Sequence, residues 1–452
     1  MNKKLMAVAV AGALAAPVAM AQSNVTISGR MSLGVDSYSA SGATQSTSSG
    51  LTSRNRVWDN GSRLNVAGSE DLGNGLKAEF YVETGFNADN GLLSSNGSNN
   101  SSLITSTNVG GLGNRIAYVG VSGGFGSVRL GRQHVFWTNG IVDQTQTNYT
   151  QSGAPFATGG FGSGMGGQVT RQPNTVQYIS PKISGFEAIV SWSPNRQEGV
   201  QGTTTSSITG TGTPTAANAN GRLWGLTAQW TGGPFQAAWD YVEDKGNGVY
   251  STVMGQVVQG KHVGNKYRGG WSYQPGALIG LIYTQSQMTN GGAASAGFIS
   301  AASGLGIDAG SMTTLRQSAW TINWEHLVGN TRLLAQYAKA GNIKGCNASE
   351  TIASNMVGHG QTGASACDQT GAKAYLLAAQ YLLSKRTSIS VSYNKIRNDA
   401  NYFADYTTGG NSSFLNTTNG GVMSVGNTGS AAVRSLAGAD PTMWGVGIQH
   451  NF

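Results

Sequence analysis

Short segments in which apolar and polar residues alternate are the feature of this sequence that most restricts its fold. In residues 24–38, Val25, Ile27 and Val35 share one parity, whereas Arg30 and Asp36 occupy the other. A period of two over this length predicts a β-strand, because successive side chains of a strand point to opposite faces. Since the polar parity carries an arginine and an aspartate, we expect that face to be in contact with water.

The alternating pattern recurs along the chain. Short turns such as Gly123-Gly124 and Pro275-Gly276 join some segments, and long loops of low complexity join the others. Short turns at one end and long loops at the other are typical of an outer-membrane β-barrel, which in a single bacterial chain has an even number of strands. We predict an antiparallel transmembrane barrel of sixteen strands, with fourteen or eighteen as alternatives. The strands are expected at residues 24–38, 60–69, 75–86, 113–123, 125–133, 171–181, 185–194, 222–231, 234–244, 263–274, 277–288, 317–328, 330–341, 373–383, 386–398 and 441–452.

The composition favours a membrane barrel over a soluble domain. Charged residues make up 11% of the chain, against about 25% in soluble domains. No run of about 18 apolar residues follows the amino-terminal segment, so the sequence predicts no transmembrane helix. A soluble β-sandwich is the alternative, but it accounts poorly for sixteen strands and for aromatic residues near strand ends. Those aromatic residues are expected to form girdles at the membrane interfaces: Trp192, Trp230, Trp239, Tyr241, Trp271, Tyr273 and Trp444.

Residues 1–21 have the pattern of a secretory signal peptide. Lys3 and Lys4 precede an uncharged apolar stretch that ends in Ala19-Met20-Ala21, an A-x-A cleavage site. The mature chain, residues 22–452, then has 26 basic and 20 acidic residues, a net charge of about +6. Because the chain is exported and has no later run of Lys and Arg, we expect no nucleic-acid partner.

One segment between predicted strands is unusually long. A strand ends near Gln133, and the next begins at Arg171. A structureless loop of this length is usually functional or disordered. We predict that this third loop, at about residues 134–170, folds into the bore of the barrel and narrows it.

Four stretches carry a resemblance to a known family. They are Val25 to Arg30, the hairpin Gly68 to Ala78, Phe125 to Gln133, and Trp444 to the terminal aromatic residue Phe452. Together they resemble the trimeric general porins of Gram-negative bacteria, in particular their β-proteobacterial branch. The resemblance implies a sixteen-stranded barrel, a homotrimer, contact with outer-membrane lipid and lipopolysaccharide, and an inward third loop at a constriction.

In such porins an arginine cluster on the wall faces acidic groups on the third loop. Motif matching assigns Arg30, Arg63, Arg132 and Arg171 to that cluster here. The loop has only one acid, Asp143, so the constriction is expected to be net positive. Strict alternation would place Arg129 inward instead of Arg132, whereas a bulge at Gly131 would re-aim Arg132. Both arginines are kept as constriction candidates.

Further charges stand on the polar parity of the strands. We expect Lys77, Glu79, Lys266 and Arg268 to line the pore. The alternative for each basic residue is a salt bridge that braces the wall. Since arginine remains charged even beside other arginines, and apolar walls focus the field of such charges, the sequence predicts a channel for small hydrophilic solutes that prefers anions.

Other motifs carry less weight. Gly162 to Gly167 fits G-x-G-x-x-G, but no apolar strand precedes it and no helix follows. The histidines lack metal-ligand spacing, and no G-x-S-x-G elbow supports a hydrolase, so we expect no enzyme activity, cofactor or metal. Cys346 and Cys367 are expected to form a disulfide that closes one exposed loop.

Two other functions remain open. Loop aromatics, such as Phe136 and Phe161, could form a solute track in a substrate-specific channel, or they could simply pack the loop onto the wall. Long Asn-, Ser- and Thr-rich loops would also suit a surface adhesin.

Overall fold

Sixteen strands form one closed antiparallel sheet. The computed structural model describes residues 24–42, 51–89, 91–93, 111–136, 171–194, 222–245, 249–251, 256–258, 261–289, 307–308, 314–345, 351–352, 368–400, 438 and 440–452. The predicted barrel and its strand count are confirmed. The wall strands are β1 (Asn24–Ser41), β3 (Arg63–Gly73), β4 (Leu76–Asn87), β6 (Ile116–Gly123), β7 (Gly126–His134), β8 (Arg171–Ile179), β9 (Phe186–Ser193), β10 (Arg222–Gly232), β11 (Phe235–Lys245), β14 (Lys261–Gln274), β15 (Ala277–Thr289), β17 (Thr314–Val328), β18 (Thr331–Ala340), β20 (Ala372–Leu382), β21 (Thr387–Asn398) and β22 (Asp440–Asn451).

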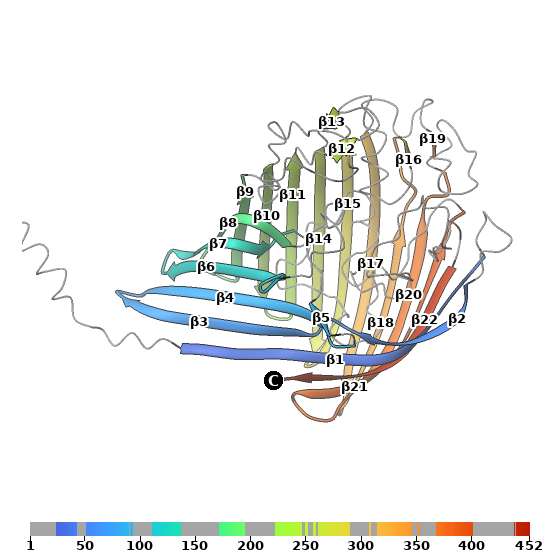
Figure 1. Ribbon diagram of the computed structural model, residues 1–452, viewed down its shortest axis with the longest axis horizontal. Helices are drawn as coiled ribbons and strands as arrows, with labels where there is room; N and C mark the ends of the chain where they lie inside the picture. The colour runs from blue at the N-terminus through green and yellow to red at the C-terminus, as the bar shows by residue number, and fades with distance from the viewer. Residues whose placement is uncertain are drawn as a thin grey trace, which may run out of the picture.

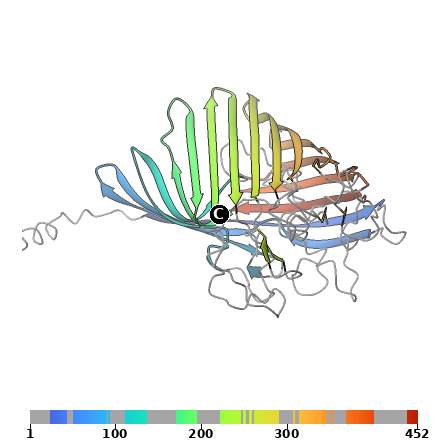
Figure 2. The same ribbon diagram turned by 90° about the horizontal axis from the view of Figure 1, so that it is seen from above.

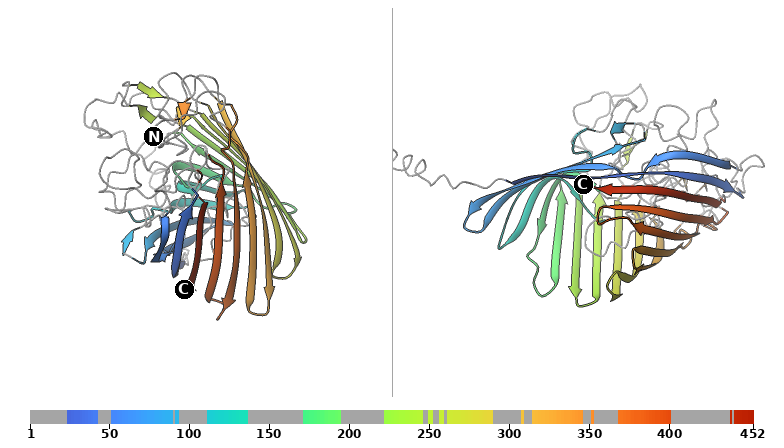
Figure 3. Two further views of the ribbon diagram at one scale, coloured as in Figure 1. Left: turned by 90° about the vertical axis from the view of Figure 1, so that its right-hand side faces the viewer. Right: turned by 90° about the horizontal axis from the view of Figure 1, so that it is seen from below.

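Each wall strand pairs with its neighbours in sequence order, and the last strand pairs with the first. Arg30 of β1 lies opposite Asn451 of β22, and the pairing continues to Ser41 opposite Asp440. Gly29 and Phe452 also exchange two backbone hydrogen bonds, of 2.9 and 3.1 Å. Figure 3 shows β22, in red, beside β1, in blue. This closure removes the sheet edges that would otherwise expose unpaired backbone groups.

The two faces of the wall have opposite polarity. Val25 and Ile27 are 60% and 66% exposed on the outer face, whereas Asp36 of the same strand is buried on the inner face. The same inversion holds on β9, where exposed Trp192 lies between buried Ser191 and Ser193, and on β21, where exposed Ile389 and Val391 alternate with buried serines. A wall with its apolar side chains outside and its polar ones inside suits a bilayer around it and water within it.

The second wall position is occupied by two strands in succession. β2 (Leu51–Asp59) pairs with the later half of β1, and β3 pairs with its first half. The predicted strands leave residues 39–59 outside the wall, and that prediction is wrong for residues 39–41 and 51–59. Only Leu51, Val57 and Trp58 are apolar in this segment, so its alternation is weak, and the strand forms because pairing with β1 overrides weak local preference.

Short extra strands lie within the long predicted loops. Four of them stand at the upper ends of the upright wall strands in Figure 1, and the fifth, β5 (Leu92–Leu93), lies beside β4. The hairpins that join consecutive wall strands fan out along the curved sheet in Figure 2. In the described part of the chain no helix is long and apolar enough to cross a membrane. The extra strands are β5 (Leu92–Leu93), β12 (Val249–Ser251), β13 (Gln256–Val258), β16 (Ile307–Asp308) and β19 (Thr351–Ile352).

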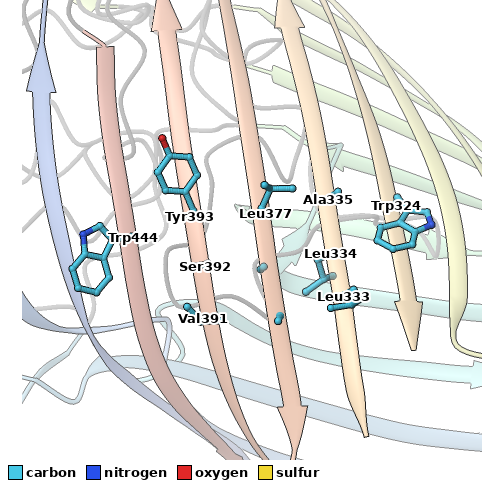
Figure 4. A pocket seen from close by; sticks show the side chains of 11 residues that line it. Trp324, Leu333, Leu334, Ala335, Leu377, Val391, Ser392, Tyr393 and Trp444 are labelled. Atoms are coloured by element: carbon cyan, nitrogen blue, oxygen red, sulfur yellow. The ribbon is translucent and has the colours of Figure 1, made fainter. Parts of the chain in front are cut away.

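A shallow depression of about 440 Å³ lies on the outer wall across β17, β18, β20, β21 and β22. Trp324 and Trp444 stand at its two sides, with Leu377 and Tyr393 between them (Figure 4). Its lining is apolar apart from Ser392 and the tyrosine hydroxyl. The depression is therefore part of the apolar outer surface, and we look for the functional site on the inner wall.

Candidate functional site

Arg30 and Arg63 lie directly opposite each other on the inner face of β1 and β3. Like charges in this position repel each other. Arg30 is buried and donates hydrogen bonds to the carbonyl oxygens of Asn60, at 2.9 Å, and Gly61, at 2.9 and 3.3 Å. These carbonyls belong to the break between β2 and β3, so the break provides the acceptors that hold Arg30 beside Arg63.

Glu83 of β4 supplies a carboxylate on the Arg63 side of this pair. Its oxygens lie 2.5 Å from Nε of Arg115 and 3.8 Å from Nε of Arg63. The hydroxyl of Tyr81 also hydrogen-bonds to Glu83, at 3.3 Å. Glu83 therefore bridges two arginines that come from different strands of the wall.

Arg132 of β7 lies in the same region. The register between β7 and β8 shifts between Gly131 and Gln133, and Gly131 has a φ of 139°, which favours glycine. Nε of Arg132 donates to the carbonyl oxygens of Asn114 and Arg115, at 3.0 and 3.1 Å. The extra residue of this register shift lies on β8, between Gln172 and Thr175, where Asn174 has a φ of 55°. Arg132 stays in register with Ala117 of β6, so a bulge in β7 that re-aims Arg132 is not shown, and Arg132 reaches the region through its contacts beside Arg115.

Arg171, the first residue of β8, lies opposite His134 in the sheet. It interacts electrostatically with Arg63, Arg115 and Arg132 and with Glu83. We call Arg30, Arg63, Arg115, Arg132 and Arg171 the arginine cluster. Its five guanidinium groups are accompanied by the carboxylates of Glu83 and Asp59, so these groups together carry a formal net charge of +3.

Arg115 is the member that sequence reasoning missed. It shares the parity of Val119 and Val121, which are exposed on the outer face, so alternation would place it outside. Arg115 instead precedes the first residue of β6 and follows a turn that contains Gly113, whose φ is 72°. The sequence signal that could have identified Arg115 is the preceding pair Gly113-Asn114, which predicts a turn, and next to a turn strict alternation no longer applies.

Arg129 has a different environment from the cluster. Its Nε lies 2.8 Å from a Glu79 oxygen that also accepts a hydrogen bond from Ser127, and its guanidinium lies 4.6 Å from the ring centre of Tyr118. Arg129 and Glu79 therefore form an ion pair on the wall. Lys77 is exposed two residues beyond the β3–β4 turn, at the end of the barrel where the short turns lie.

Lys266 and Arg268 lie on β14, far along the sheet from the cluster. Arg268 contacts both oxygens of Asp240 on β11 at 2.9 Å, and Lys266 lies 3.7 Å from this carboxylate. Thr227 donates a further hydrogen bond of 2.7 Å to Asp240. We call Asp240, Lys266 and Arg268 the Asp240 triad. All three residues are buried.

Several expected features lie outside the described residues: the signal peptide at 1–21, Asp143 and most of the third loop, and the cysteines Cys346 and Cys367. Among the residues that the structure describes, no group of three His, Cys, Asp or Glu side chains could hold a metal ion.

Comparison with known proteins identifies the family. Residues 7–401 match the Gram-negative porins. The major outer membrane protein P.IB of Neisseria gonorrhoeae is 32% identical over 204 residues, which cover 45% of this chain and 51% of that protein. The chain therefore spans about half the length of the first curated relatives that it matches.

Solved structures agree on the fold. The anion-selective porin from Comamonas acidovorans superposes with a TM-score of 0.60 at 19% identity, covering 95% of this chain and all of that one. The trimer form of OmpT, an outer membrane protein of Vibrio cholerae, has a TM-score of 0.55 at 11% identity, covering 95% and 99%. At these identities the likeness concerns the fold alone. From the family match and the closed barrel, we conclude that the chain belongs to the Gram-negative porin family and is a protein of the outer membrane.

Proposed function

We propose that the protein is a diffusion channel for small hydrophilic solutes and ions, and that it prefers anions. The observation that carries this proposal is the arginine cluster, in which five guanidinium groups stand with the carboxylates of Glu83 and Asp59 on the inner wall. Basic rings of this kind select anions in other pores.

The mechanism is electrostatic. Arginine keeps its charge at every accessible pH, even beside other arginines. In water, one such charge attracts a monovalent anion about 8 Å away by roughly 0.5 kcal/mol and repels a cation by the same amount. Screening in about 0.1 M salt reduces both energies to roughly half, which leaves about a twofold difference between anions and cations. The apolar wall focuses this field into the bore. The excess charge of +3 therefore supports a clear preference for anions, including small carboxylates and phosphate.

The comparisons give partial support. One solved neighbour is described as an anion-selective porin, although its low identity supports the fold more than the selectivity. A second neighbour is described in a trimer form, and we extend the proposal to a homotrimer in the outer membrane, in contact with lipid and lipopolysaccharide. Light scattering of the purified protein in detergent tests the trimer.

The decisive experiment is the reversal potential across a planar bilayer under a salt gradient. The wild type is expected to show anion preference, and Arg63→Ser and Arg171→Ser are each expected to lower the permeability ratio about twofold. Arg332→Ser is the matched control, because Arg332 is paired with Glu325 at 2.7 Å on another part of the wall. Arg332→Ser should lower the permeability ratio by less than Arg63→Ser or Arg171→Ser does.

Other outcomes would favour other functions. Cation preference in the wild type would refute the electrostatic proposal. Saturable block of the current by one solute would favour a substrate-specific channel. A folded, inserted protein without conductance would favour an adhesin.

A further inference from the structure

The chain that leaves β7 turns inward and packs against distant wall strands. Val135 and Phe136 follow directly after His134, yet both are buried against Leu223 of β10 and Val242 of β11. Two wall strands, β8 and β9, separate β7 from β10 in the sheet. These two residues therefore cross the inner face of the wall instead of continuing along it.

Lys266 holds the backbone of this crossing. Its Nζ donates a 2.7 Å hydrogen bond to the carbonyl oxygen of Phe136 and lies 5.4 Å from the centre of the Phe136 ring. The lysine side chain is 3% exposed. Hydrogen bonds from a charged donor are roughly twice as strong as neutral ones, and the ammonium also interacts with the ring face. Because the ammonium is sealed from the bore in this way, it is poorly placed to attract permeating anions.

Two glycines make room for the crossing. A Cβ at Gly225 of β10 would lie 3.0 Å from Cγ1 of Val135, and a Cβ at Gly264 of β14 would lie 2.8 Å from Cζ of Phe136. The second distance is shorter than real Cβ contacts. At these positions the absence of a side chain forms a hollow that receives Val135 and Phe136.

The backbone of Phe136 is in an unusual conformation. Its φ is 32°, a left-handed value that is rare for a bulky residue. Such a conformation persists only where the surrounding structure determines it. The hydrogen bond from Lys266, the hollow at Gly264 and the contact with Val242 supply those constraints.

We propose that Lys266 is a positioning residue which, with Gly225 and Gly264, forms a seat for Val135 and Phe136 on the far wall. We call this arrangement the Phe136 seat. Its role is to fix how far the chain leaving β7 projects across the bore beside the arginine cluster. This inference rests on the proposed channel function, and it assigns the charge of Lys266 to docking and not to anion attraction.

The first test is a cross-link. Val135→Cys with Gly225→Cys, in a background with Cys346→Ser and Cys367→Ser, places two thiols within reach of disulfide geometry, in which the Cβ atoms are about 3.8 Å apart. We expect rapid disulfide formation on oxidation of the folded barrel, detected by mass spectrometry of the linked peptides. The single-cysteine variants serve as controls. A folded barrel that does not cross-link would overturn the proposal.

The second test addresses the role of Lys266. In the cross-linking background, Lys266→Gln is expected to slow disulfide formation about tenfold, as the loss of a hydrogen bond from a charged donor implies. Lys261→Gln removes the same charge from the same strand, where Lys261 is paired with Glu243 at 2.9 Å, and should leave the rate unchanged. Equal rates in the two variants would show that Lys266 does not position the crossing.

A third variant needs no added cysteine and changes no charge. Gly264→Val should push the Phe136 ring off the wall, shift the single-channel conductance and increase open-channel noise. Gly269→Val is the matched control, because a Cβ at Gly269 on the same strand meets no atom within 4 Å. Identical currents from both variants would contradict the seat.

These readouts separate the two proposals. If the wild type prefers cations but the cross-link forms and depends on Lys266, then the anion proposal fails and the Phe136 seat remains. If the wild type prefers anions and the cross-link does not form, then only the seat fails.

Discussion

The arginine cluster and the Asp240 triad are two charged regions of the same inner wall, built in opposite ways. The cluster brings five cations together with two carboxylates and leaves part of its surface open, since the Arg63 side chain is 25% exposed. In the triad, by contrast, Asp240 lies between two cations, and none of the three side chains is more than 3% exposed. A charge excess costs little where water can screen it, whereas buried charges must be paired. The cluster is therefore suited to act on mobile ions, and the triad is suited to hold the wall and the Phe136 seat.

The largest expected effect comes from breaking the triad. Asp240→Asn leaves Lys266 and Arg268 buried without their counter-charge, and removing one partner of such a buried pair costs about 3–5 kcal/mol. We expect the free energy of unfolding in urea, measured with the barrel in detergent micelles, to fall by this amount.

The matched variant for this prediction is Glu325→Gln. Glu325 and Arg332 form a 2.7 Å ion pair whose side chains are partly open to solvent, so the loss should be nearer 1 kcal/mol. An equal loss in the two variants would remove the distinction between buried and accessible charges on this wall.

The second prediction concerns salt. The Debye length shortens from about 10 Å at 0.1 M to about 3 Å at 1 M, so the field of the cluster should reach less of the bore at high salt. We expect the anion-to-cation permeability ratio to fall steadily as the mean salt concentration rises at a fixed gradient. A ratio independent of salt would indicate that selection does not arise from the field of the cluster.

The fold was largely predictable because it depends on a local rule. Alternation within each strand is imposed by lipid on one side and water on the other, so sixteen segments could be located without knowing their partners. The exception was Leu51–Asp59, whose strand depends on pairing with β1, since its own sequence alternates only weakly.

The site was less predictable, because its residues come together through irregular backbone. Arg115 follows a turn and therefore escapes the alternation rule, and Arg132 joins the cluster through hydrogen bonds to the carbonyl oxygens of Asn114 and Arg115 in that same turn region. The roles of Lys266 and Arg268 depend on Asp240 and Phe136, which are distant in sequence. No local pattern could separate these buried charges from charges exposed to the bore.

The third prediction tests whether the excess positive charge of the cluster sets the anion preference. Glu83→Gln removes the carboxylate that bridges Arg63 and Arg115. We expect anion preference to rise about twofold, since one more positive charge is left uncompensated near the bore. The reversal potential measures this change. Glu187→Gln is the control, because Glu187 hydrogen-bonds to Gln229 on another part of the wall. A fall in anion preference on Glu83→Gln would mean that the arginines need Glu83 to hold their positions, and that their order matters more than their number.

The smallest effect is expected from removing a balanced pair. Arg129 and Glu79 face each other at 2.8 Å, and both are partly exposed. Partly exposed pairs of this kind contribute about 0–1 kcal/mol to stability. The double variant Glu79→Gln with Arg129→Gln keeps the net charge of the wall and should leave both the reversal potential and the free energy of unfolding close to those of the wild type. Arg132→Gln alone, three residues beyond the inward Arg129 and within the cluster, should lower anion preference about twofold. If the double variant lowers anion preference as much as Arg132→Gln does, then Arg129 acts on ions despite its partner, and selectivity would follow the positions of the arginines and not the local excess of charge.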